Sequence, residues 1–145
     1  MRLVQRARTS AAPAQVWEVL GAPARWPEFE PFLRRVRGTH GVAVAGQTLV
    51  GVSRIGSLAV PIDVLEVETA RRLVLRVHTA PGVGELLTFE VVPVVSGGSD
   101  LTCSVVVDGV LARAAAGPLW AASGLTVRLL AARAHRLARA ARRAA

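Results

Sequence analysis

Between residues 34 and 108 the sequence is a succession of strand-like segments joined by turns of only a few residues. The segments are 34–39, 47–55, 58–68, 71–79, 85–95 and 100–108. Turn signals such as His40-Gly41 and Ser96-Gly97-Gly98-Ser99 separate them. A parallel connection needs a crossover of a dozen residues or more, so these short links predict an antiparallel meander. Residues 2–9 alternate weakly and predict one further strand.

The alternation within the strand-like segments predicts a sheet with one polar and one apolar face. In 85–92, Leu87 and Phe89 fall on one side, and Thr88 and Glu90 fall on the other. The residues that this alternation assigns to the apolar face include Leu73, Leu75, Val77, Phe89, Val91, Cys103 and Val105. An apolar sheet face has to be covered by another element.

Residues 118–143 have a helical pattern and are the expected cover. At about 100° per residue, one apolar stripe contains Leu119, Ala122, Thr126, Leu130, Ala134, Leu137 and Ala141. Gly117-Pro118 is the expected entry to this helix, and Arg133 projects near the centre of the stripe. Two shorter helices are expected earlier, one starting near Pro13 and ending at Gly21, and one opening at Pro23.

Composition limits the class of protein. A chain of 145 residues with 52% hydrophobic residues fits one domain, 1–145, with a buried core. The N-terminus has no apolar signal region, and the longest charge-free stretch near the C-terminus is too short to span a bilayer, so we expect a cytoplasmic protein. The lone Cys103 excludes an intrachain disulfide and is expected to be a small buried residue.

The net charge is +8, and all 18 basic residues are arginines. No acidic residue follows Asp108, so the C-terminal segment is strongly basic. Such a segment could contact nucleic acid or an anionic membrane, but more often it is the solvated face of a helix. We therefore expect no nucleic-acid partner, and we leave peripheral membrane contact open.

Two stretches of sequence resemble a known family. The segment APAQVWEVLGAPARWPEFEPFLRRVRG at 12–38 is similar to the opening motif of the START-like (SRPBCC) superfamily, particularly its polyketide cyclase/dehydrase branch. The strand pair VLEVETARRLVLRV at 64–77 and LLTFEVVPVVSGGSDLTCSV at 86–105 resembles later motifs of the same family. The chain departs from the family at Ala22, at Thr69-Ala70 and at Ser99-Asp100, which replace an aspartate, a double proline and a Gly-Thr pair.

The resemblance implies an α+β helix-grip fold, in which a curved antiparallel sheet wraps around a long C-terminal helix and leaves a cavity between them. It also implies an apolar small-molecule ligand, such as a lipid, a quinone or a polyketide-like compound. We expect no cofactor, and either a monomer or a homodimer. The expected ligand-binding residues are Trp26, Phe32, Leu75, Val77, Phe89, Val91, Cys103, Val105, Trp120, Thr126 and Leu130.

An enzyme is the first alternative, a polyketide cyclase or dehydratase acting on a bound poly-ketone. Asp63 shares the phase of Leu65 and Val67, and could work with Arg133 in proton transfer. The alternatives that we favour are that a bulge after Pro61 turns Asp63 to solvent and that Arg133 extends along the helix edge. The sequence has no standard catalytic motif, and its scattered histidines predict no metal site. A second alternative is an interaction protein that uses its basic C-terminal helix.

Overall fold

A computed structural model describes residues 1–145. The elements in chain order are β1 (Arg2–Thr9), α1 (Pro13–Leu20), the 3-10 helix η1 (Pro23–Glu28), β2 (Leu33–Arg37), β3 (Thr48–Ser53), β4 (Ala59–Glu68), β5 (Arg72–Ala80), β6 (Val83–Pro93), β7 (Ser99–Asp108) and α2 (Ala112–Ala144). These bounds lie within a few residues of the predicted segments, except at the start of α2.

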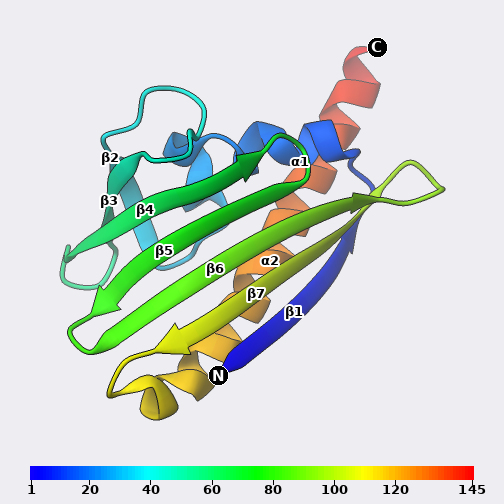
Figure 1. Cartoon of the computed structure of the whole chain (residues 1–145). Coiled ribbons are helices and arrows are strands. Elements are labelled where there is room, and N and C mark those ends of the chain that lie inside the picture. Colours follow the sequence, from blue (N-terminus) through cyan, green and yellow to red (C-terminus); the bar gives the residue numbers. More distant parts are fainter.

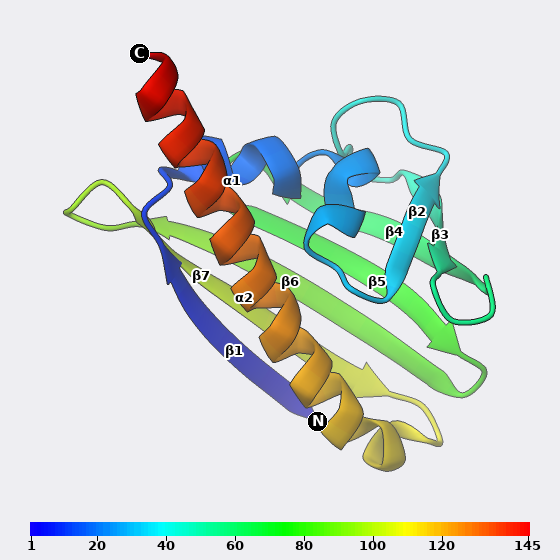
Figure 2. The same cartoon turned by 180° about the vertical axis from the view of Figure 1, so that it is seen from behind.

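The strands form one antiparallel sheet in the order β1-β7-β6-β5-β4-β3-β2. The sheet curves, and α2 crosses its concave side, mainly against β1 and β7 (Figure 1). Seen from behind, α1 and η1 lie beside α2 over the same side of the sheet (Figure 2). The predicted helix-grip arrangement is therefore confirmed.

The helix α2 begins at Ala112, six residues before Pro118, where the sequence predicts its start. Alanine-rich sequence before the proline favours helix. Pro118 cannot donate to the carbonyl of Ala114, but Ala114 is exposed and water can bind that carbonyl instead. The proline is therefore tolerated near the solvated end of the helix.

Small residues let α2 approach β1 closely. A Cβ atom added to Gly124 would lie 3.2 Å from Cδ of Gln5 on β1. Further along, the Thr9 hydroxyl donates a hydrogen bond of 3.0 Å to the carbonyl of Ala131. The centre of the buried helix face runs through Val127, Ala131, Ala134 and Ala138, so it is rotated slightly from the predicted stripe.

Candidate ligand cavity

A cavity of about 400 Å³ lies between the concave face of the sheet, η1 and the N-terminal half of α2. Of its 24 lining residues, 17 are hydrophobic. Phe32, which is 48% exposed, and Leu58, which is 65% exposed, belong to the lining as well as the surface, so they mark its mouth. The cavity can therefore exchange an apolar molecule with the outside.

Most of the residues expected to bind a ligand lie in this cavity. Those that line it are Trp26, Phe32, Leu75, Val77, Phe89, Cys103, Val105 and Thr126. Val91 and Leu130 are buried in the core instead, outside the cavity lining. Trp120 is 55% exposed and points away, because its neighbours Leu119 and Ala122 take the cavity side of α2.

Two glutamates that the sequence did not single out are the only charged residues in the lining. Glu30 follows η1, and its carboxylate accepts hydrogen bonds of 2.7 Å from the Thr126 hydroxyl and 3.2 Å from the Phe32 N–H. Glu85, on the inner face of β6, is only 7% exposed and accepts a hydrogen bond from the Thr79 hydroxyl. Neither carboxylate has a basic partner within ion-pair distance.

The apolar surroundings perturb the acid groups of the cavity. Burial raises the pKa of Glu30, against the hydrogen bonds from Thr126 and Phe32, which favour its ionised form. Burial also raises the pKa of Glu85, and the nearby Glu30 carboxylate adds to this effect. Burial, followed by the charges of these two glutamates, raises the pKa of Cys103 to about 12, so its thiol stays neutral.

The sequence carries a signal for only one of these glutamates. Extending the alternation of Leu87 and Phe89 two residues back along β6 places Glu85 on the inner face. Glu30 lies between η1 and β2, where no regular period applies. Its position depends on the path of the chain after Phe29, which only the fold determines.

Of the two alternatives for Asp63, the structure has the one in which a bulge turns it to solvent, so its inward orientation is wrong. Leu65 forms a bulge in β4, so the strand changes phase between Val64 and Glu66. Counting back from Val67 by twos therefore selects the wrong face before the bulge. Asp63 lies on the outer face, where it accepts a hydrogen bond of 3.3 Å from Thr48 and lies 3.2 Å from Nε2 of His78.

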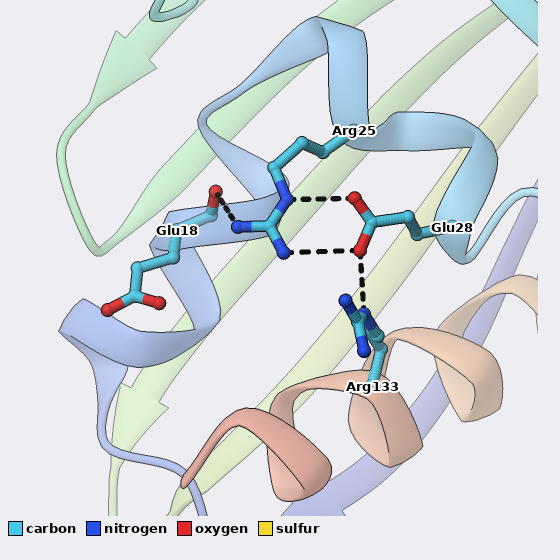
Figure 3. A network of polar contacts seen from close by, with 4 residues as sticks. All are labelled: Glu18, Arg25, Glu28 and Arg133. Atoms are coloured by element: carbon cyan, nitrogen blue, oxygen red, sulfur yellow. Dashed lines mark hydrogen bonds and ion pairs between the residues drawn. The ribbon is translucent and has the colours of Figure 1, made fainter. Parts of the chain in front are cut away.

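Arg133 also lies outside the cavity, at the edge of the buried helix face. Its Nε donates a hydrogen bond of 2.6 Å to Glu28, whose carboxylate is also bound by Arg25 at 2.8 Å (Figure 3). Arg25 reaches back to the carbonyl of Glu18 at 3.4 Å. The hydrogen bond from Arg25, followed by that from Arg133, lowers the pKa of Glu28 below its ordinary value. Arg133 thus connects α2 to η1, the element that carries Trp26 into the cavity wall.

Replacing Arg133 with leucine should cost at most about 1 kcal/mol of stability, because ion pairs between partly exposed side chains contribute little. Glu28 keeps Arg25 as its partner, so η1 should stay in place. Urea denaturation measures the free energy of unfolding, and Arg136→Leu, at an exposed position with no ion pair, is the control. A loss of ligand affinity in the Arg133 variant alone would contradict a purely structural role.

The basic C-terminal end of α2 is exposed to solvent. The terminal residues of α2, including Arg139, Arg142 and Arg143, are exposed where the helix extends past the sheet (Figure 2).

No group of three or more His, Cys, Asp and Glu side chains is placed to hold a metal ion. None of the helices combines the length and apolar character that crossing a bilayer requires.

Comparison with known proteins gives a family match and several structural likenesses. The family model described as polyketide cyclase / dehydrase and lipid transport matches residues 1–142. Protein MLL2253 of Mesorhizobium loti is similar in structure, with 19% identity, a TM-score of 0.74, and coverage of 94% of this chain and 96% of that one. The comparison with curated proteins finds no match.

Two further solved structures share the fold at low identity. DynU16, a protein of the dynemicin biosynthetic locus, has 18% identity and a TM-score of 0.71 over 90% of this chain and 45% of its own. Ara h 8.0201 has 12% identity and a TM-score of 0.71 over 92% of this chain and 97% of its own. At such identities these likenesses establish the fold alone.

Proposed function

Because this chain belongs to the polyketide cyclase/dehydrase and lipid transport family, we propose that it binds an apolar small molecule in the cavity between its sheet and α2. The observation that carries the proposal is a cavity of about 400 Å³ with a predominantly hydrophobic lining and an exposed rim. Burying roughly 300 Å² of apolar ligand surface, at about 25 cal/mol per Å², would contribute several kcal/mol before ordering costs. A burial free energy of this size is enough for binding without any covalent step.

The polar groups of the cavity would orient the ligand. Small-molecule sites are usually apolar, with a few convergent polar groups that fix orientation. In this cavity Glu30 and Glu85 are the charged groups that would fix the orientation of the ligand, whereas Asp63 and Arg133 lie outside the lining. An acid–base step on a bound ligand, as in the enzyme alternative, would therefore use the two glutamates.

Filling the cavity should abolish ligand binding and leave the fold intact. Leu87 is half-buried and lines the cavity, so the ring of Leu87→Trp would occupy the space of a ligand. The control is Leu86→Trp, the same substitution one residue earlier, on a side chain that faces away from the cavity. We expect loss of binding of about tenfold or more for the first variant alone, since lost burial of ~1.4 kcal/mol already corresponds to tenfold.

The measurement is native mass spectrometry of protein purified from its own host, followed by denaturing extraction of what is bound. A compound that co-purifies with wild type and with Leu86→Trp, but not with Leu87→Trp, would support the proposal. A compound retained equally by both variants would be bound elsewhere and would contradict it.

A further inference from the structure

The charge of the cavity is opposite to that of the protein. The chain carries a net charge of +8 and 18 arginines, yet none of the 24 lining residues is basic. Two of the chain's 10 acidic residues line the cavity instead. Burying a carboxylate without a basic partner costs stability, so a purely apolar or anionic ligand would not account for these two.

One carboxylate oxygen is open to a ligand. Glu85 is more than nine-tenths buried, and Thr79 donates to its Oε1. Its Oε2 accepts no hydrogen bond within the chain and keeps some accessible surface, and because Glu85 lines the cavity, this oxygen is open to a ligand there. Glu30 uses one hydrogen bond on each oxygen, and carboxylate oxygens can accept a second. A hydrogen-bond donor in the cavity would therefore find acceptors on both glutamates.

Aromatic rings line the same cavity. All three phenylalanines of the chain, Phe29, Phe32 and Phe89, line the cavity together with Trp26. Phe29 immediately precedes Glu30, and its ring meets Phe89 edge to face with 6.3 Å between centroids. Aromatic faces attract cations, particularly where water is excluded. The aromatic lining and the two carboxylates favour the same kind of group.

We propose that the ligand of this cavity is an apolar molecule with an amine group, and that its protonated nitrogen donates hydrogen bonds to Glu30 and Glu85. This inference rests on the proposed function and adds the ligand's chemical class to it. The two carboxylates have no basic partner in the chain, and an ammonium group would supply both hydrogen-bond donors and a positive charge. A fatty acid would place a third carboxylate beside them, and an alcohol would supply one donor without charge.

Three probes with the same chain and different head groups test this proposal, namely decylamine, decanol and decanoate. Titration calorimetry near neutral pH should give about tenfold or more tighter binding for the amine than for the alcohol, because hydrogen bonds to charged groups are the stronger ones. Decanoate should bind most weakly. The positive surface of the protein would favour the opposite order, so non-specific surface binding cannot produce this result.

The double variant Glu30→Gln/Glu85→Gln keeps the shape of the cavity and removes its charge. Its preference for the amine over the alcohol should fall to about threefold or less, since the remaining amide oxygens still accept hydrogen bonds. Glu90→Gln, on the outer side of β6 beside Arg72, is the control and should retain the wild-type preference. Single variants show whether either carboxylate dominates.

The outcomes separate this inference from the proposed function. Similar affinities for all three probes, abolished by Leu87→Trp, would overturn the amine preference and leave apolar binding in the cavity intact. A preference for decanoate, or an amine preference unchanged in the double glutamine variant, would also overturn it. Failure of wild type to bind any of the three would count against both proposals.

Discussion

Replacing Leu130 with alanine should lower the free energy of unfolding by about 3–5 kcal/mol. Leu130 is 1% exposed and lies in the main core cluster, where α2 covers the sheet. The alanine variant loses the burial of the side chain and leaves a void, because close-packed neighbours relax only partly. Urea denaturation followed by circular dichroism measures the difference.

A matched substitution on the same helix shows whether the loss comes from the core. Leu125 is 43% exposed, so Leu125→Ala should change the free energy of unfolding by less than about 0.5 kcal/mol. Leu130 does not line the cavity, so ligand affinity measured on the folded Leu130→Ala protein should stay near the wild-type value. Similar stability losses at the two positions would mean that α2 does not cover the sheet in the way described.

The sheet could be predicted from the sequence because its information is local. Short turns specify antiparallel neighbours, and the alternation in β5 to β7 specifies the inner face. In β4 this rule failed at Leu65, where a bulge changes the phase without any proline or glycine at that point to mark it. One extra residue puts Asp63 on the outer face, as the bulge alternative predicts, whereas strict alternation would put it on the inner one.

The helix α2 shows a second limit of periodicity. A stripe drawn at about 100° per residue fixes which residues share a face, but not how the helix rotates against its sheet. Contacts with β1 through Gly124 and Ala131 set that rotation here. As a result Arg133 lies at the edge of the buried face and binds Glu28, while Thr126 lies in the cavity as expected.

The candidate site was predicted in its apolar part and missed in its charged part. Apolar residues on the inner face line a cavity whichever strand they come from, so most of them could be assigned. The alternation of β6 places Glu85 on the inner face, but because glutamates near a strand end are usually solvated, this signal alone does not single it out as a site residue. Glu30 reaches Thr126 across 96 positions of sequence, a contact that only the folded chain reveals.

Replacing Glu85 with glutamine should stabilise the protein at alkaline pH and have little effect at acidic pH. The ordinary pKa of a glutamate is 4.5, and burial, followed by the Glu30 charge, raises the pKa of Glu85 above it in the folded state. The folded protein therefore binds this proton more tightly than the unfolded chain does. Stability is greatest below the ordinary pKa and falls as pH rises through the folded-state value.

Glutamine resembles the neutral acid at every pH and keeps an oxygen that can accept the hydrogen bond from Thr79. The stability difference between Glu85→Gln and wild type should thus open as pH rises above the ordinary glutamate pKa of 4.5, as measured by urea denaturation. The other titratable groups facing the cavity are Glu30 and Cys103, and Glu30→Gln should show the same sign because burial raises its pKa too.

Glu90→Gln is the control for this profile, since it removes a carboxylate that lies on the outer side of β6 beside Arg72. It should show no stability gain at alkaline pH. If Glu85→Gln instead destabilised the protein at all pH values, the carboxylate of Glu85 would have a stabilising, structural role, which would contradict this prediction. A gain confined to alkaline pH means that the native carboxylate is kept at a cost to stability, as expected of a group that acts on a ligand.

A bound amine would supply the positive charge that Glu85 lacks in the folded protein. The presence of decylamine should therefore reduce the stability gain of Glu85→Gln at alkaline pH, and the presence of decanol should not.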